Sequence, residues 1–269
     1  MKKITSIVLA LVLALSLFAG CANNTDEKTI VVAASPTPHA EILTVAAEEL
    51  AKVGYTLQIR KFNDYVVPNT ATEDGEVDAN YFQHQPYLTT FNAEQHTHLV
   101  AVAAIHYEPF GIYAGTKAST ADLASGDKIA IPNDGSNRAR ALLLLQAQGL
   151  IQLKEGVGVE ATVLDIVDNP HALEIVEMEA AQIANVRDSV ALAVINGNYA
   201  LSAGLNVSKD ALATEDSSSE VALQYANILV VKEGNEKSEK IQALINALKS
   251  EAVKAYIEST YNGAVVPLF

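Results

Sequence analysis

The organisation of the chain is clearest in the stretch Ile129-Ala130-Ile131-Pro132-Asn133-Asp134-Gly135-Ser136-Asn137-Arg138-Ala139-Arg140. Its apolar beginning predicts a strand over Lys128–Ile131. After the polar turn, a heavily apolar segment predicts a helix over Asn137–Gln148, whose first turn Asp134 or Ser136 can cap. A strand that passes through a short turn into a helix is the repeating unit of an α/β fold.

Short β-branched runs alternate with helical patterns along most of the chain, which favours an α/β fold with mostly parallel sheets. A helix is predicted over His39–Val53, and the C-terminal helical stretch is expected to break near Ser250. Further strands are predicted at Ile30–Ala34, Thr56–Phe62, Leu99–Ile105, Leu173–Glu177, Val190–Ile195 and Ile228–Val231.

The strand and helix patterns fall into two blocks, residues 29–112 and about 122–226, followed by C-terminal helices. Terminal elements often pack back on a first domain, so we expect residues 29–112 and 228–269 to form lobe I. Residues 113–227 would form lobe II. Ligands of open α/β sheets bind at the carboxyl ends of strands or between domains, so the residues just after strands are the candidates for a site.

The N-terminus has the pattern of a lipoprotein signal peptide. Two lysines, an apolar run and the small-residue stretch Phe18-Ala19-Gly20 precede Cys21, the only cysteine of the chain. The apolar run Ile4–Phe18 is shorter than the roughly 20 residues of a membrane-spanning helix. We therefore predict cleavage of residues 1–20, acylation of Cys21 by fatty acids such as palmitate, and a flexible tether over residues 21–28. The alternative is an uncleaved anchor with an incidental cysteine.

Charge and cysteine content exclude some classes of function. The net charge is −14, and it becomes −16 without the leader, which carries two lysines and no acidic residue. Such a surface repels nucleic acid. One cysteine cannot form a disulfide within the chain, so the fold must be stabilised by packing even in an oxidising compartment.

Asn137 and Arg140 are the first candidate ligand-binding residues. They are three positions apart at the start of a predicted helix and therefore share a face, where free backbone N–H groups and the helix dipole favour an anion. A guanidinium can hold a carboxylate in a fork while the amide adds a donor. The alternative is that Arg140 forms a structural salt bridge with an acidic neighbour.

An aromatic group lies in the stretch Asp78-Ala79-Asn80-Tyr81-Phe82-Gln83-His84-Gln85-Pro86-Tyr87. Phe82 and His84 share one side if this segment ends a strand, and Tyr87 follows one turn later. Tyr65, after the second strand, could close the same pocket. Aromatic rings beside polar groups suit an apolar or thioether side chain. The alternative is that these rings belong to the core.

Asn196 and Asn227 complete the candidate pocket. Asn196 directly follows the strand Val190–Ile195, and Asn227 leads into another strand. Amide side chains both donate and accept hydrogen bonds, so the two residues could orient an amino-acid backbone without adding charge. The alternative for Asn196 is the turn that Asn-Gly pairs commonly form.

Motifs for metal, cofactor or catalysis are weak. His96 and His98 with His84 or His106 suggest a zinc receptor, but no carboxylate stands at a motif spacing. The G-x-G-x-x-A match at Gly156–Ala161 follows a polar turn and not a strand, and Gly111–Lys117 is one residue short of a P-loop. No G-x-S-x-G or H-E-x-x-H sequence is present. We expect no enzyme activity, no cofactor and no metal.

The chain strongly resembles the methionine-binding lipoprotein family (NlpA/MetQ type), the substrate-binding component of ATP-driven methionine importers. The resemblance extends over about residues 30–269. It rests on the stretches Phe62-Asn63-Asp64-Tyr65-Val66, Asp78-Ala79-Asn80-Tyr81-Phe82-Gln83-His84, Ile131-Pro132-Asn133-Asp134, Ala141-Leu142-Leu143-Leu144-Leu145-Gln146, Gly149-Leu150-Ile151, Ile175-Val176-Glu177 and Ala193-Val194-Ile195-Asn196-Gly197-Asn198-Tyr199-Ala200.

The resemblance implies a two-lobed periplasmic-binding-protein-like receptor that closes on L-methionine and passes it to an ABC permease with a cytoplasmic ATPase. It implies Arg140 and Asn137 for the carboxylate, and Asn196 and Asn227 for the other polar groups. The side-chain pocket is implied to consist of Tyr65, Phe82, His84 and Tyr87.

The chain departs from the family pattern at Arg138 and in a longer region at Ser217–Glu220. The alternatives to methionine are a related zwitterion, such as a methionine-containing dipeptide or another amino acid, and a surface adhesion or interaction lipoprotein.

Overall fold

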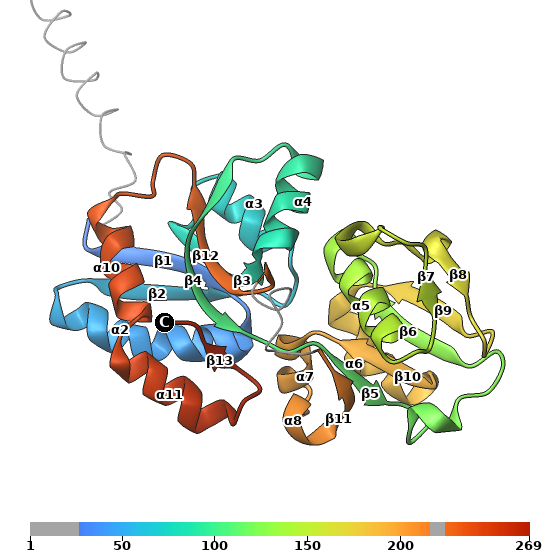
Figure 1. Ribbon diagram of the computed structural model, residues 1–269. Coiled ribbons are helices and arrows are strands. Elements are labelled where there is room, and N and C mark those ends of the chain that lie inside the picture. The colour runs from blue at the N-terminus through green and yellow to red at the C-terminus, as the bar shows by residue number, and fades with distance from the viewer. Residues whose placement is uncertain (1–26, 216–223) are drawn as a thin grey trace, which may run out of the picture.

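The computed structural model describes residues 27–215 and 224–269. The predicted signal peptide, Cys21 and the Ser217–Glu220 region lie outside the described residues. The chain forms two α/β bodies, each built on its own sheet, and these sit side by side (Figure 1). The predicted two-lobed α/β fold is therefore confirmed.

The first body is built on a six-stranded sheet. β1, β2, β3 and β4 run parallel to one another, whereas β12 and β13 run antiparallel to their neighbours, so the sheet is mixed. In spatial order its strands are β13 (Val266–Pro267), β4 (Leu99–Tyr107), β12 (Asn227–Lys232), β3 (Ala79–His84), β1 (Thr29–Ala34) and β2 (Thr56–Lys61).

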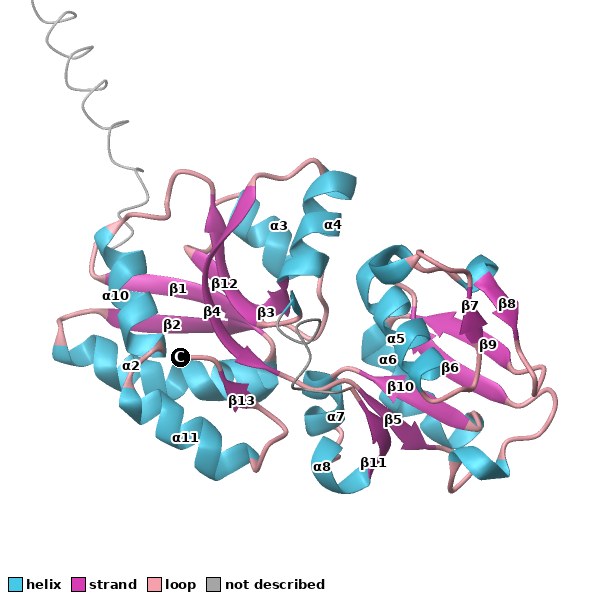
Figure 2. Cartoon of the chain, viewed as in Figure 1, coloured by secondary structure: helices cyan, strands magenta, loops and turns pink. Residues whose placement is uncertain are grey.

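Helices cover both faces of this sheet (Figure 2). Side chains alternate across a strand, and in β1 Ile30 and Val32 pack with the first group of helices, whereas Ala33 packs with Ala71 of the second. A strand covered on both faces reads as the continuous apolar run seen in the sequence. The first group is α2 (Glu41–Lys52), α10 (Glu239–Leu248) and α11 (Glu251–Tyr261), and the second is α3 (Val67–Glu73) and α4 (Gln85–Gln95).

The second body is built on a five-stranded sheet in which β5 runs antiparallel to both of its neighbours. Its strands are, in order, β11 (Ala211–Thr214), β5 (Gly111–Ala114), β10 (Leu192–Ile195), β6 (Lys128–Pro132) and β9 (Glu174–Met178), and β7 (Gln152–Leu153) pairs with β8 (Ile166–Asp168) beside it. Its helices are α5 (Gly135–Ala147), α6 (Ala180–Val186), α7 (Gly197–Ser202) and α8 (Val207–Asp210). Short turns are η2 (Thr120–Asp122), η3 (Gly158–Glu160), η4 (Val163–Asp165) and η5 (Arg187–Ser189).

Two crossings connect the bodies. The chain leaves the first sheet after Tyr107 and enters the second at Gly111; it leaves the second after Thr214 and re-enters the first at Asn227. β5, the first strand after the first crossing, runs antiparallel to β10, and β12, the first strand after the second crossing, runs antiparallel to β3. Both sheets are therefore mixed and not wholly parallel. The predicted lobe boundary at residue 112 falls inside β5.

All the predicted strands are present, with bounds that differ by one or two residues, but β3 was only suspected and β5, β7, β8, β11 and β13 were not predicted. The first predicted helix is present as α2, which begins two residues after the predicted His39. A separate turn, η1 (Pro36–Ala40), precedes α2, and Thr37 within it is extended (φ −135°, ψ 134°) because the following Pro38 disfavours helical backbone. No helix in the described ranges is long and apolar enough to cross a membrane.

The predicted break at Ser250 is confirmed, and it yields a test. The Ser250 hydroxyl accepts a hydrogen bond from the Val253 N–H at 3.3 Å and caps α11. Ser238 caps α10 by position, but its buried hydroxyl has no partner among the described residues. Ser250→Ala should therefore lower the free energy of unfolding in urea by about 1 kcal/mol. Ser238→Ala should lower it by less, and equal losses would contradict this account of the cap.

Candidate functional site

A narrow cavity lies where strand ends of the two sheets face each other. β3 ends at His84 and β10 at Ile195, and β12, which runs antiparallel to β3, begins at the same edge with Asn227. This is the position at which open α/β sheets hold ligands. The lining residues are Tyr65, Phe82, Gln83, His84, Tyr87, Glu108, Asn137, Arg140, Asn196, Gly197, Asn198 and Asn227.

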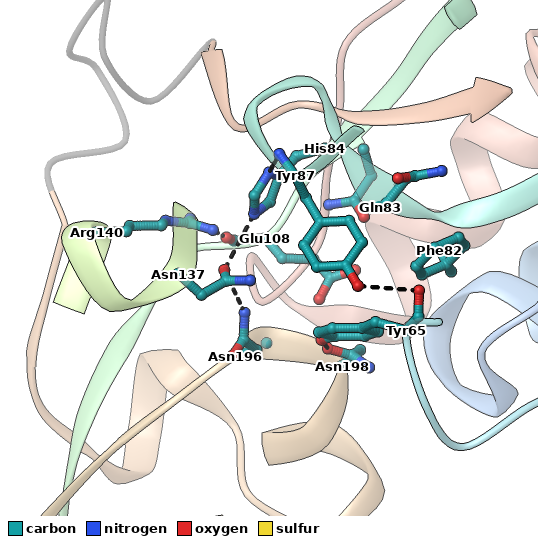
Figure 3. A pocket seen from close by; sticks show the side chains of 12 residues that line it. Tyr65, Phe82, Gln83, His84, Tyr87, Glu108, Asn137, Arg140, Asn196 and Asn198 are labelled. Atoms are coloured by element: carbon teal, nitrogen blue, oxygen red, sulfur yellow. Dashed lines mark hydrogen bonds between the residues drawn. The ribbon is translucent and has the colours of Figure 1, made fainter. Parts of the chain in front are cut away.

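The structure thus brings together all eight side chains that the sequence predicted for ligand binding (Figure 3). The first body supplies Tyr65, Phe82, His84, Tyr87 and Asn227, and the second supplies Asn137, Arg140 and Asn196. Their roles toward a ligand remain a prediction.

Asn137 is held at the start of α5 by the helix cap. Asp134 accepts hydrogen bonds from the Asn137 N–H at 2.9 Å and from its amide Nδ2 at 2.9 Å. The Asn137 Oδ1 in turn accepts from Asn196 Nδ2 at 2.8 Å and lies 3.1 Å from His84 Nε2. Asn137 therefore connects the two bodies through its oxygen, and its donor atom is already bonded to the cap.

Arg140 lies one turn further along α5 and is 4% exposed. Its Nε and Nη2 donate to the two carboxylate oxygens of Glu215 at 2.7 and 2.6 Å, and Nη2 also donates to the Glu108 carbonyl at 3.0 Å. The salt bridge that was the alternative for Arg140 is thus present. Among the described residues Nη1 forms no hydrogen bond, and Arg140 lines the cavity.

Both crossings between the bodies converge on this ion pair. Glu215, just after β11, also accepts from the Tyr107 hydroxyl at 2.7 Å and the Phe110 N–H at 3.2 Å in the first crossing. The guanidinium carbon lies 4.2 Å from the ring centre of Tyr225 in the second crossing, a cation–π distance. The charged pair beside the cavity therefore contacts both segments that connect the two bodies.

His84 is neutral and fixed in one tautomer. Its Nδ1 accepts from the Tyr87 N–H at 3.2 Å at the start of α4, so its Nε2 carries the proton that faces Asn137. Burial, with a further contribution from the Arg140 charge, lowers the pKa of His84 to about 3. His84 thus acts as a hydrogen-bond donor and adds no charge to the cavity.

Tyr65, Phe82 and Tyr87 form an aromatic wall. Ring centres of Tyr65 lie 5.7 Å from Phe82 and 5.6 Å from Tyr87, within the range of tilted and edge-to-face pairs. The Tyr87 hydroxyl donates to the Tyr65 carbonyl at 3.0 Å, which fixes the loop that carries Tyr65. Such a wall can surround an apolar or thioether side chain.

Asn196 and Asn227 differ in whether their Oδ1 atoms already have a hydrogen-bond partner. Asn227 Oδ1 is bonded to His39 Nε2 at 2.9 Å. The Asn196 Oδ1 is buried and has no partner among the described residues. A buried acceptor without a partner is costly, and one on a cavity wall is a ready partner for a ligand donor.

Hydrogen bonds also close the bodies on each other at the rim. The Tyr65 hydroxyl donates to Asn198 Oδ1 at 2.5 Å, and the Tyr199 hydroxyl donates to the Asn63 carbonyl at 3.0 Å. The two tyrosine rings lie 5.0 Å apart. These contacts join the first body to the start of α7 and cover one side of the cavity.

The histidines that the sequence suggested as zinc ligands do not come together in the structure. His98 lies 3.5 Å from Glu73 on the surface, whereas His84 lines the cavity. In the described ranges, the group that could hold a cation is His39, His106 and Glu108, whose ligand atoms lie within 4.8 Å of one another. His106 Nε2 is bonded to Glu108 Oε1 at 2.7 Å, and His39 Nε2 is bonded to Asn227 Oδ1 at 2.9 Å.

The sequence analysis missed several residues of the site. Glu108 directly follows β4, so the rule that selected Asn196 would have selected it too. Asn198 stood in the stretch that was quoted but was not chosen. Glu215 is 75 positions from Arg140 and carried no sequence signal. Gln83 and Gly197 also line the cavity.

Comparison with known proteins is consistent with this geometry. The model of the NlpA lipoprotein family matches residues 30–269. The methionine-binding lipoprotein MetQ of Bacillus subtilis is 42% identical over 276 residues, which cover 100% of this chain and 99% of that protein.

Two solved structures are similar over most of the chain. A putative lipoprotein from Ruminococcus gnavus is 62% identical with a TM-score of 0.89, covering 90% of this chain and 100% of that one. A nutrient-binding protein from Burkholderia cenocepacia bound to methionine is 41% identical with a TM-score of 0.85, covering 89% and 100%.

The Arg140–Glu215 pair yields a prediction on stability. Burial would raise the pKa of Glu215, but the charge and hydrogen bonds of Arg140 outweigh it and hold the pKa below its ordinary value of 4.5. The stabilisation is therefore complete above about pH 4.5 and is lost as the pH falls below it. Glu215→Gln should lower the free energy of unfolding in urea by about 2–3 kcal/mol near pH 7, and this difference should shrink toward about pH 3.

Glu174→Gln serves as the matched control. Glu174 pairs with Lys128 at 3.4 Å, and both side chains are more than half exposed, so little change is expected. A Glu215→Gln loss that is as small as the control, or that does not depend on pH, would contradict the role given to the pair.

Proposed function

The chain belongs to the NlpA lipoprotein family, and from this premise we propose that it is a lipid-anchored extracytoplasmic receptor that captures L-methionine for an ABC importer. The family is one of transport substrate-binding proteins and not of enzymes. The relative bound to methionine supports the choice of ligand.

The observation that carries the proposal is the chemistry of the cavity. It combines a buried guanidinium with one free edge, a buried amide oxygen without a partner, and a wall of three aromatic rings. An amino acid with an apolar side chain presents the complementary groups: a carboxylate, an amine and a tail. Sulfur is attracted to aromatic rings, which favours a thioether tail.

Binding is proposed to involve the eight side chains predicted from the sequence. Arg140 Nη1 would hold the carboxylate, with Asn137 placing the helix start beside it. Asn196 and Asn227 would face the backbone polar groups, and Tyr65, Phe82, His84 and Tyr87 would surround the tail. Closure excludes water, so the ion pair with the carboxylate gains strength in a lower effective dielectric.

The lobes are proposed as residues 29–112 with 228–269, and residues 113–227. Sheet membership supports this division with two exceptions. Gly111 and Ile112 pair with β10 in the second sheet, and Asn227 pairs with β3 and β4 in the first. The partners are proposed to be a permease with a cytoplasmic ATPase and, through lipid on Cys21, the outer face of the cell membrane.

Calorimetry with a panel of amino acids tests the function. The panel contains both enantiomers of methionine, alanine, glycine and methionine-containing dipeptides, and the protein lacks the lipid. We expect methionine to bind with the highest affinity. Tight binding of a dipeptide without binding of methionine would refute the specificity, and no binding by any member would favour an adhesion or interaction protein.

Arg140→Ala should lower the affinity for methionine by roughly 100-fold or more, because the ligand's carboxylate loses its buried partner. Arg138→Ala is the matched control, since Arg138 lies on the same helix, pairs with Glu177 at 3.4 Å and does not line the cavity. Its affinity should equal that of the wild type. Thermal melting checks that each variant is folded, and unchanged affinity in Arg140→Ala would show that the carboxylate binds elsewhere.

The aromatic wall yields a second prediction. Phe82 lines the cavity, whereas Phe91 belongs to the same ring cluster, is equally buried and does not line it. Phe82→Leu should lower the affinity for methionine by about 2- to 10-fold, because the contact between sulfur and ring is lost. The affinity for norleucine, which has a methylene in place of the sulfur, should fall less. Phe91→Leu should leave both affinities unchanged. Equal effects of the two variants would mean that the rings serve packing alone.

A further inference from the structure

The chain contains two Asn-Gly pairs, Asn196-Gly197 and Asn262-Gly263. Asparagine is a thermolabile residue, and it is most labile before glycine, because glycine has no Cβ to keep its main-chain nitrogen away from the asparagine side chain. The two pairs have the same sequence but different surroundings. These surroundings therefore decide which pair reacts.

Asn196 is protected by burial and hydrogen bonds. It is 6% exposed, and its Nδ2 donates to Asn137 Oδ1 at 2.8 Å. Its carbonyl accepts from the Ala200 N–H at 2.9 Å as α7 begins, and Gly197 beside it is buried. The Gly197 nitrogen can reach the side-chain carbon of Asn196 only if this peptide rotates, so the buried contact must open first.

Asn262 and Gly263 are in the opposite situation. Both are exposed, and they directly follow the last residue of α11. Neither the Asn262 side chain nor the Gly263 N–H has a hydrogen-bond partner among the described residues. The peptide between them is held by one long hydrogen bond, from Ser208 Oγ to the Asn262 carbonyl at 3.5 Å. It can therefore rotate at little cost.

The end of α11 requires this pair of residues. Asn262 has φ 49° and Gly263 has φ 85°, so both lie in the left-handed region. Glycine adopts this conformation freely, and asparagine is one of the few other residues that tolerate it. The backbone geometry that ends the helix thus selects the two residue types whose combination is chemically labile.

We propose that Asn262 deamidates spontaneously in the folded protein. The Gly263 nitrogen attacks Asn262 Cγ and forms a bond to it, the Cγ–Nδ2 bond breaks, and Nδ2 leaves as ammonia with the proton of the Gly263 nitrogen. Water then opens the cyclic imide at either carbonyl, which gives aspartate or isoaspartate. In isoaspartate the Cβ methylene becomes part of the main chain.

The reaction occurs at a contact between the two bodies (Figure 1). Asn206, which caps α8 of the second body, donates from Nδ2 to the Tyr261 carbonyl at the end of α11 at 3.3 Å. A new carboxylate beside the last carbonyls of a helix is unfavourable, and a lengthened main chain displaces them. Deamidation therefore weakens this contact. Neither residue lines the cavity, so the inference does not depend on the proposed function.

Peptide mapping tests the chemistry. The folded protein is incubated in mildly alkaline buffer, and both pairs are followed by mass spectrometry and by enzymatic methylation of isoaspartate. Asn262 should convert at least about 10-fold faster than Asn196, because local opening of a buried contact costs free energy that lowers the rate. In urea the two rates should become similar. Equal rates in the folded protein, or no conversion of Asn262, would overturn the proposal.

Thermal melting tests the effect on the contact. Incubated wild type should melt about 2–4 °C below the fresh protein. Asn262→Gly keeps the left-handed backbone and cannot deamidate, so its melting temperature should not change on incubation. An unchanged melting temperature of fully converted wild type would overturn the effect on the contact.

Asn206→Ser is the matched variant on the other side of the contact. Serine still caps α8, but its side chain is too short to keep the hydrogen bond to the Tyr261 carbonyl. Incubation should therefore lower its melting temperature by less than that of the wild type, because the contact is already weakened. An equal fall in both proteins would assign the loss to α11 alone and contradict the role given to the contact.

Discussion

The buried ion pair between Arg140 and Glu215 is the constraint on which both the cavity and the two crossings between the bodies depend. A guanidinium that is 4% exposed must have a counter-charge, and Glu215 supplies it through two short hydrogen bonds. The same carboxylate accepts from the first crossing, and a ring of the second crossing stacks on the cation. The two segments that connect the bodies therefore contact the same charged pair, and its arginine lines the cavity.

The remaining polar groups of the cavity are mostly bonded to one another, which orients them before any ligand arrives. His84, Asn137 and Asn196 form one connected set, and Asp134 anchors it to the helix start. Preorganised donors and acceptors need little ordering on binding, so more of each contact appears as affinity. Two polar atoms of this group have no hydrogen bond among the described residues, Arg140 Nη1 and Asn196 Oδ1.

Much of the fold was predictable because its signals are local. The apolar run of β1, the capped start of α5 and the break at Ser250 each depend on neighbouring residues, and all were found. The partner of Arg140 could not be found, because a pairing across 75 positions leaves no pattern in one sequence. Phe82 and Tyr87 could be identified as a cluster, but only their positions in space separate them from Phe91, which the sequence cannot distinguish from a lining ring.

The hydrogen bonds between the two bodies at the rim of the cavity stabilise the arrangement of the bodies and do not involve a ligand. Tyr65 bonds to Asn198, and Tyr199 to the Asn63 carbonyl, through atoms that belong to the protein alone. They stabilise the closed arrangement by the same amount whichever ligand is inside, so they raise the affinity for every ligand and discriminate between none. Discrimination must come from groups whose bonding changes with the ligand. Under the proposed function those groups would be Arg140 and the aromatic wall, which would contact the two ends of an amino acid separately.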